Sequence, residues 1–152
     1  MSGSKTISRR QKAILIRPAR ESDFEILCSL DQVAKKARKR REFIRRAIAS
    51  GSCFVAVTGQ EIIGYGMLNY TFYDYGFINM LYVAADQRRR GAGTALLEQL
   101  ERQCRTPKLF TSTNMSNVAM QSLLTRHEYV LVGVIHELDE GDAEIVYSKR
   151  LR

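Results

Sequence analysis

Hydrophobic and polar positions alternate with two different periods along the chain. A short apolar run at residues 13–17, stopped by Pro18, predicts a strand. Two stretches with helical spacing follow, and Ser22 with Glu25 has the spacing of a capping box at the start of the first. The first stretch carries its apolar residues at Phe24, Leu27, Leu30, Val33, Ala34 and Ala37, and the second at Phe43, Ile44, Ala47 and Ile48. Gly51 is placed to end the second helix.

A run of strands comes next. Alternating apolar positions predict strands at residues 52–58, 61–70 and 77–83, joined by turns at residues 59–60 and 74–76. Such short connections favour antiparallel hairpins, because parallel strands need a much longer crossover.

Helical spacing then returns and alternates with strands. Helices are predicted at residues 94–104 and 116–127, and strands at residues 109–113, 129–136 and 143–149. The predicted order is β-α-α-β-β-β-α-β-α-β-β. This order favours an α/β fold with a mixed, mostly antiparallel twisted sheet and helices on both faces.

Length and composition indicate one globular domain. The chain has 152 residues, of which 45% are hydrophobic and 26% charged. We expect a single domain at residues 13–152 behind a disordered leader at residues 1–12. No apolar run approaches the ~18 residues of a membrane span, so we expect no membrane association.

The three cysteines Cys28, Cys53 and Cys104 are far apart and form no CxxC pair. This spacing argues against a disulfide framework and against a zinc site. We therefore expect buried thiols, no metal and a cytoplasmic location.

Positive charge is concentrated in two segments. The net charge is +8, yet residues 35–46 (KKARKRREFIRR) hold eight basic residues and one glutamate, and three arginines follow one another at residues 88–90. The rest of the chain is therefore close to neutral. The longer segment is usually a solvated face, although it could recruit an acidic partner or nucleic acid. No helix-turn-helix, zinc finger or RNA-binding aromatic motif accompanies it, which argues against nucleic acid.

The second basic segment opens a helix. A strand, a short loop and a helix start meet there, and two glycines let the backbone approach a ligand closely. Unpaired N–H groups at the helix start, with the arginine side chains, suit a pyrophosphate. The loop lacks the Lys-Ser or Lys-Thr of a P-loop and the GxGxxG of a dinucleotide site, and the glycines could also merely shape a turn.

The loop sequence Arg88-Arg89-Arg90-Gly91-Ala92-Gly93 resembles the Arg/Gln-x-x-Gly-x-Gly/Ala motif of the GCN5-related N-acetyltransferase superfamily. The preceding residues 81–86 and the following Ala-Leu-Leu are similar to the family as well. A second family motif on a later helix, Asn-x-x-Ala-x-x-Leu-Tyr-x-x-x-Gly-Phe, is matched in part by Asn117, Leu123 and Tyr129.

The resemblance implies an acyl-CoA N-acyltransferase fold and an acetyl-CoA-dependent transfer of an acetyl group to a primary amine of a small molecule or peptide. By the same resemblance, acetyl-CoA would bind as co-substrate to a strand, to the loop and to the start of a later helix. The implied residues are Leu81, Tyr82, Val83, Arg88, Arg89, Arg90, Gly91, Ala92, Gly93, Thr94 and Asn117. Asn117 could equally satisfy backbone groups at the start of its own helix.

Two departures from the family leave the catalytic groups open. The helix tyrosine that serves as acid in many members is Leu124 here, and the strand glutamate that serves as base corresponds to Asn79. A third position, glycine in the second motif, is Glu128. The catalytic candidates are Asn79, Tyr73, Glu137 and Tyr147, with Tyr70, Asp74, Tyr75 and His136 also considered.

These departures keep an alternative open, a non-catalytic acetyl-CoA-binding regulatory module. The sequence leaves open the acceptor amine, the role of residues 35–46 and the formation of a homodimer.

Overall fold

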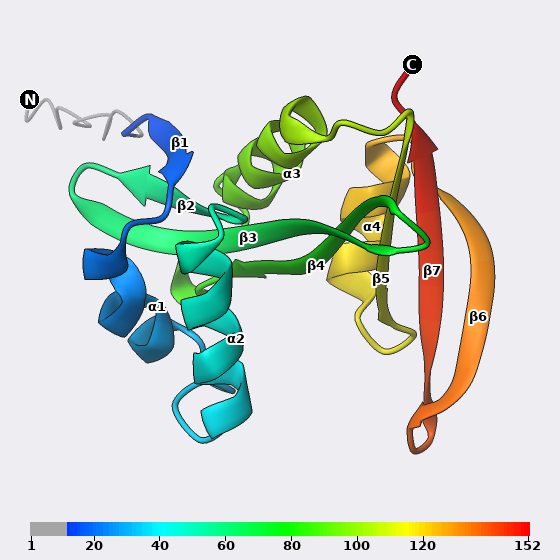
Figure 1. Cartoon of the computed structure of the whole chain (residues 1–152), viewed down its shortest axis with the longest axis horizontal. Coiled ribbons are helices and arrows are strands. Elements are labelled where there is room, and N and C mark those ends of the chain that lie inside the picture. The colour runs from blue at the N-terminus through cyan, green and yellow to red at the C-terminus, as the bar shows by residue number, and fades with distance from the viewer. Residues whose placement is uncertain (1–11) are drawn as a thin grey trace, which may run out of the picture.

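The computed structural model describes residues 12–152, so residues 1–11 of the predicted leader lie outside the described part (Figure 1). The helices are α1 (Phe24–Leu30), α2 (Arg38–Ala49), α3 (Ala92–Gln103) and α4 (Val118–Arg126). The strands are β1 (Ile14–Pro18), β2 (Cys53–Thr58), β3 (Glu61–Phe72), β4 (Tyr75–Val83), β5 (Lys108–Asn114), β6 (Val130–Asp139) and β7 (Asp142–Arg150). The predicted order is confirmed, with short 3-10 turns added at Glu21–Asp23 and Ala85–Gln87.

The strands form one sheet in the order β1-β2-β3-β4-β5-β7-β6. Every neighbouring pair is antiparallel except β4 and β5, which are parallel. Helices α1 and α2 cover one face of the sheet, and α3 and α4 cover the other (Figure 1). The predicted mixed, mostly antiparallel sheet between two helical layers is therefore confirmed.

Two hydrophobic clusters lie on opposite faces of the same strands. In β2, Cys53 and Val55 pack with α1 and α2, whereas Phe54 and Ala56 pack on the side of α3. Because side chains alternate along a strand, a strand buried on both faces reads as a continuous apolar run. Burial also raises the pKa of the Cys53 thiol to about 12, so this thiol stays protonated.

Helix α3 lies close against β3 because β3 carries Gly66 at the contact. A Cβ atom added at Gly66 would come within 3.0 Å of Cδ1 of Leu100. This close packing fixes the second half of α3 at a short distance from the sheet.

Strand β4 is bulged at Asn79. Met80 pairs with Met67 of β3, but Ile78 pairs with Leu68, so Asn79 is an extra residue in β4. The parallel pairing of β4 with β5 covers only Gly76 to Ile78 and ends at the bulge. Beyond it β4 runs away from β5 in Figure 1, so its second half has a paired partner on the β3 side alone among the described residues.

Three local predictions are wrong. Helix α1 ends at Leu30 and does not continue to Ala37, because buried Asp31 accepts the N–H groups of the next turn. The predicted capping box of Ser22 and Glu25 is replaced by Asp23, whose carboxylate accepts the Arg20 N–H at 2.7 Å ahead of the helix.

The turn between β3 and β4 also differs from the prediction of residues 74–76. It is built on Tyr73 (φ 50°) and Asp74 (φ 64°), one residue earlier. An aromatic residue is an uncommon choice for positive φ, which explains why the pattern did not indicate it.

Strand β6 forms the outer edge of the sheet beside β7, and nearly its whole length is exposed. None of the helices between residues 12 and 152 combines the length and apolar character needed to cross a bilayer.

Candidate functional site

The glycine loop connects the open half of β4 to the first turn of α3. Gly91 stands at the N-cap of α3 with φ 91°, a left-handed conformation that suits glycine. No side chain caps the helix, and its first backbone bond runs from Ala95 N–H to Gly91 C=O at 3.0 Å. The N–H groups of Ala92, Gly93 and Thr94 thus have no acceptor among the described residues. They form a donor set that suits an anion.

The three arginines surround this donor set without occupying it. Arg88 Nε donates to the Val83 carbonyl at 3.1 Å, and Arg90 Nη1 donates to Gln87 Oε1 at 3.1 Å. Arg89 has a positive φ of 62°, which turns the chain sharply toward Gly91. All three side chains are exposed, so they keep positive charge around the helix start.

The end of β4 contributes residues to both faces of the sheet. Leu81 and Val83 pack against the cluster of α3 and α4, and Tyr82 packs against the cluster of α1 and α2. The Tyr82 hydroxyl accepts the Gln32 N–H at 3.4 Å, and its ring centroid lies 5.9 Å from that of Tyr65. Strand β4 is therefore tied to the connection between α1 and α2.

A buried polar network holds this connection in place, and the sequence did not predict it. Asp31 is 0% exposed and accepts hydrogen bonds from the Tyr65 hydroxyl and from Arg40 Nη1, the latter at 3.2 Å. Burial first, and the Asp31 carboxylate second, raise the pKa of Tyr65 well above its usual range. Arg40 Nη1 also lies 3.2 Å from Met80 Sδ on the open half of β4. The available signal in the sequence was Asp31 itself, a charged residue directly after the apolar helical run that ends at Leu30.

Asn79 lies at the point where β4 leaves β5. Its Oδ1 is buried and has no hydrogen-bond partner among the described residues. A buried acceptor without a hydrogen-bond donor costs stability, so the described residues leave one polar group unsatisfied at the bulge. Just before this point β5 is still bound to β4, because Thr111 Oγ1 of β5 donates a hydrogen bond to the Ile78 carbonyl of β4 at 2.9 Å.

Helix α4 supports the loop and is itself capped by Asn117. Asn117 Oδ1 accepts the Met120 N–H at 3.2 Å, so this side chain does satisfy local backbone. Thr94 Oγ1 lies 3.3 Å from His127 Nε2, which links the first turn of α3 to the end of α4. His127 was not among the predicted residues, and its sequence position gave no signal.

The departures from the family motif in α4 and just after it are explained by their surroundings. Leu124 is 0% exposed and belongs to the hydrophobic core under α3. At the position of the family tyrosine this chain therefore has a core side chain. Glu128 has φ 67° just after the helix, the conformation for which the family motif uses glycine.

The other catalytic candidates are spread over the sheet. The ladder β4-β5-β7 places Tyr147 across Thr111 from Ile78, with its side chain in the core. Tyr73 is 83% exposed at the β3–β4 turn, and Glu137 is exposed toward the opposite end of the sheet. The structure therefore brings only Tyr147 into the neighbourhood of Asn79.

The remaining candidates lie away from the open half of β4. Tyr70 accepts the Arg105 N–H at 3.0 Å beyond the end of α3, and Tyr75 packs against Phe110 with ring centroids 5.5 Å apart. Asp74 forms the β3–β4 turn, and His136 lies on exposed β6. Between residues 12 and 152, no three His, Cys, Asp or Glu side chains gather in a way that would hold a metal ion.

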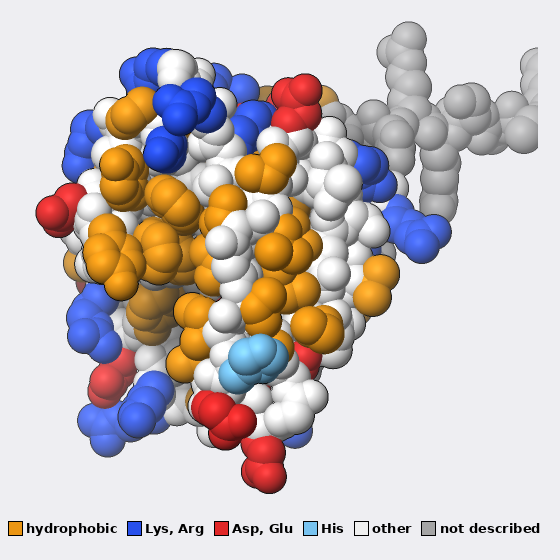
Figure 2. Space-filling model, turned by 90° about the vertical axis from the view of Figure 1, so that its right-hand side faces the viewer, with side chains coloured by type: hydrophobic (Ala, Val, Ile, Leu, Met, Phe, Trp, Pro, Cys, Tyr) orange, Lys and Arg blue, Asp and Glu red, His pale blue; other side chains and the backbone are white. Residues whose placement is uncertain are grey.

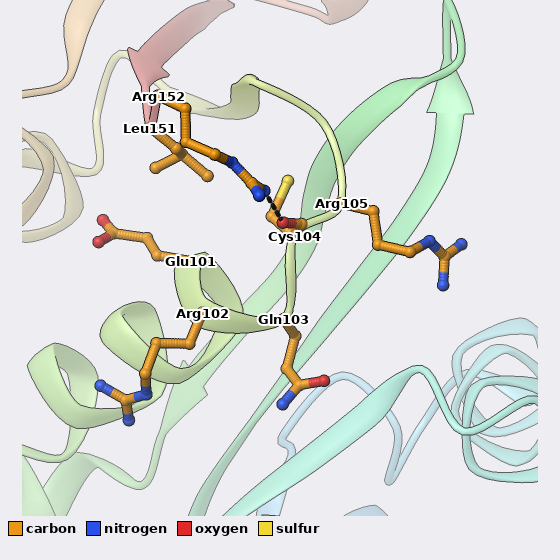
Figure 3. A pocket seen from close by; sticks show the side chains of 7 residues that line it. All are labelled: Glu101, Arg102, Gln103, Cys104, Arg105, Leu151 and Arg152. Carbon is orange, nitrogen blue, oxygen red and sulfur yellow. Dashed lines mark hydrogen bonds between the residues drawn. The ribbon is translucent and has the colours of Figure 1, made fainter.

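A cavity of about 580 Å³ lies at the opposite end of α3 from the loop (Figure 3). Arg152 Nη2 donates to the Cys104 carbonyl there at 2.6 Å. The neighbouring side chains Arg102, Gln103 and Arg105 point in different directions (Figure 3). This hollow shares no residue with the glycine loop.

Comparisons with known proteins agree on one family. The sequence model of the acetyltransferase (GNAT) family matches residues 19–129. No curated protein sequence matches the chain.

Solved structures share the fold, and one of them is described as a member of this family. An acetyltransferase of the GNAT family from Bacillus cereus ATCC 10987 is 28% identical with a TM-score of 0.85, covering 91% of this chain and 97% of that one. The yncA protein of Salmonella typhimurium, solved with its cofactor acetyl-CoA, is 14% identical with a TM-score of 0.74, covering 92% and 95%. Arabidopsis thaliana NAA60, solved with a bisubstrate analogue, is 17% identical with a TM-score of 0.74, covering 91% and 98%. The acyl-CoA N-acyltransferase fold expected from the sequence is thus confirmed.

Proposed function

Because the chain belongs to the acetyltransferase (GNAT) family, we propose that it transfers the acetyl group of acetyl-CoA to the nitrogen of an amine. The observation that carries this proposal is the uncapped start of α3, where the N–H groups of Ala92, Gly93 and Thr94 have no acceptor among the described residues. A pyrophosphate carries the negative charge and the acceptor oxygens that such a helix start binds well.

The proposed cofactor site extends from α3 onto the open half of β4. Leu81, Tyr82 and Val83 follow the bulge, where pairing with β5 has ended, and their backbone can bind an extended amide-containing arm. The arginines of residues 88–90 would add charge-assisted contacts. Asn117 would contribute through its Nδ2 group, since its Oδ1 caps α4.

The proposed reaction is direct attack of a neutral amine on the thioester carbonyl. A C–N bond forms, the C–S bond breaks, and the proton lost by the amine neutralises the CoA thiolate. Asn79 Oδ1 can accept a hydrogen bond from the amine N–H once its side chain turns toward the open side of β4, which would relieve a buried acceptor that has no donor among the described residues. A carboxamide cannot take up a proton, so we propose that Asn79 positions the amine.

Localisation and acceptor class are part of the same proposal. The thiols of Cys28, Cys53 and Cys104 are unpaired and buried, which fits a reducing cytoplasm. The acceptor is an amine of a small molecule or peptide.

Thermal unfolding with and without acetyl-CoA tests the binding step. Ligand at about 100 times its dissociation constant adds about 2.7 kcal/mol of stability, which raises the midpoint by roughly 5–10 °C for a chain of this size. We expect Gly91→Asp to weaken acetyl-CoA binding by at least about 100-fold, because it places a carboxylate where the phosphates would bind.

Gly141→Asp is the matched control for that variant. Gly141 has φ 74° and open space around its Cα, as Gly91 does, but it lies in the β6–β7 turn. Both variants should lose similar stability, and Gly141→Asp should keep wild-type affinity. Equal affinity of the Gly91→Asp variant would refute the proposed site.

Turnover separates the enzyme from a non-catalytic acetyl-CoA-binding module. Release of the CoA thiol is followed with a panel of small-molecule and peptide amines. Acetylated product in the presence of one of them supports the enzyme. Binding of acetyl-CoA with no release for any amine would favour the regulatory module.

A further inference from the structure

Strand β6 is an edge strand with an unusual apolar surface. Its only neighbour among the described residues is β7, yet six of its large hydrophobic side chains are 42–62% exposed. These side chains belong to Val130, Leu131, Val132, Val134, Ile135 and Leu138.

Both faces of β6 are apolar. Leu131 and Val134 lie opposite Tyr147 and Ile145, on the α4 side of the sheet, whereas Val130 pairs with Ser148 on the other side. A half-buried antiparallel strand normally alternates apolar and polar residues. Residues 130–135 also lack the charged residues and proline that usually protect an exposed edge.

The apolar surface continues beside β6. A hollow of about 510 Å³ is lined by Phe110, Val130 and Val132 among others. Phe110 in turn contacts Phe72 and Tyr75, with ring centroids 5.1 and 5.5 Å apart. Figure 2 shows hydrophobic side chains spread over this whole face. A contiguous patch of this kind marks a contact surface.

Charges at the two ends of β6 identify the occupant. Lys108 and Arg150 line the hollow near the start of the strand, and Glu137 and Glu140 lie near its end. Figure 2 shows acidic side chains and a histidine at the lower end of the apolar face and basic side chains at its upper end, with further basic side chains at the lower left. Two copies placed antiparallel bring the basic end of each against the acidic end of the other. Glu128 in the hollow is the exception to this pattern.

We propose that a second copy of this chain packs antiparallel against β6 about a two-fold axis near the middle of the strand. Bulges at Val132 and after Ile135 leave residues 133–135 as the regular segment for edge pairing. A stable interface covers about 800 Å² on each partner, more than this short ladder, so the contact includes the hollow beside Phe110. This interface is independent of acetyl transfer.

Sedimentation of the full chain over a wide concentration range tests the proposal. We expect a dimer for the wild type and at least a 100-fold larger dissociation constant for Val132→Lys/Val134→Lys, equivalent to about 2.7 kcal/mol. Leu15→Lys is the control, since Leu15 is 68% exposed on β1 at the other edge of the sheet. A wild type that is monomeric at every concentration, or a dimer that the double variant leaves intact, overturns the proposal.

Charge reversal tests the orientation. Glu140→Lys adds a lysine at the acidic end of β6, which faces the basic end of the second copy with Lys108 and Arg150 in both halves of the interface, so it should weaken the dimer. Glu140→Lys/Arg150→Glu should restore the dimer to near wild-type affinity. Failure of the second change to restore it would contradict the antiparallel arrangement, provided that thermal melts show both variants folded.

Discussion

The two parts of the sheet differ in how well they are covered. Strands β1 to β4 lie between α1 and α2 on one face and α3 on the other, and Val55, Ile63 and Tyr65 are fully buried there. Strands β5 to β7 have α4 on one face, and β6 is exposed along nearly its whole length. Buried apolar surface dominates folding stability, so the first part should supply most of the free energy of unfolding. The second part supplies contact surface, and the candidate site lies where the two parts separate.

The largest effect is expected from Asp31→Ala in the covered part. The change leaves the Arg40 guanidinium and the Tyr65 hydroxyl without their shared buried acceptor. Breaking a buried ion pair on one side costs about 3–5 kcal/mol, which urea unfolding of the variant should show. Tyr65→Phe is the milder companion, because it removes one donor and keeps the ion pair. A loss below about 1 kcal/mol for Asp31→Ala would show that the network does not stabilise this part.

Asp23→Asn should cost less and should depend on pH. Asp23 is 5% exposed and lies 2.7 Å from Arg17 Nη1, and this hydrogen-bonded pairing holds the pKa of Asp23 below its usual range. A lowered folded-state pKa gives stability that is complete above the unfolded value of about 3.9 and is lost as the pH falls through the folded value. We therefore expect a loss of about 2 kcal/mol at pH 7. The difference between wild type and variant should shrink below about pH 4. A difference that stays constant into acid would contradict the ion-pair explanation.

Glu128→Gly should stabilise the less covered part. The left-handed conformation at Glu128 costs a residue with a side chain about 1 kcal/mol, and glycine avoids that cost. Part of the gain is offset by the greater freedom of glycine in the unfolded chain, so we expect a net gain of about 0.5 kcal/mol. Glu128→Ala is the control, because it removes the same charge and keeps the strain. Equal stability of the two variants would refute the strain argument.

Leu131→Ala should have the smallest effect on the free energy of unfolding, less than about 0.5 kcal/mol. Leu131 is 55% exposed, so little apolar surface is lost from the folded state at dilutions where the chain is monomeric. The same deletion at Leu27, which is 0% exposed, should cost about 3 kcal/mol. Equal losses for the two leucines would remove the contrast between the two parts of the sheet.

The features that were predictable from sequence depend on local patterns. Alternation in β2 and helical spacing in α3 come from neighbours along the chain, so the element order could be read directly. The loop at Gly91 was predictable for the same reason, since it needs only a strand end, glycines and a helix start. In the structure Gly91 stands directly before α3, which begins at Ala92, two residues earlier than predicted, and cofactor binding at this loop stays a prediction.

The features that were missed depend on residues far apart in sequence. Asp31, which caps the turn after α1, can be buried there because Tyr65 and Arg40 donate hydrogen bonds to its carboxylate. The bulge at Asn79 is a mismatch between β3 and β4, and a single strand carries no sign of it. The catalytic candidates were chosen by residue type, and type alone could not tell exposed Tyr73 from buried Tyr147.

Because the pairing of β4 with β5 ends at Ile78, the second half of β4 has one unpaired edge in the middle of the sheet. Along the second half of β4, the backbone amides that face away from β3 have no pairing strand in the described part of the chain to protect them from solvent. They should exchange their hydrogens for deuterium much faster than the β3-facing amides of the same strand, because local opening is not needed there. A bound ligand whose amide groups pair with this side of β4 would slow the exchange of these amides and leave the β3-facing amides unchanged. The difference between the two sets of amides in β4 would therefore measure how much ligand is bound.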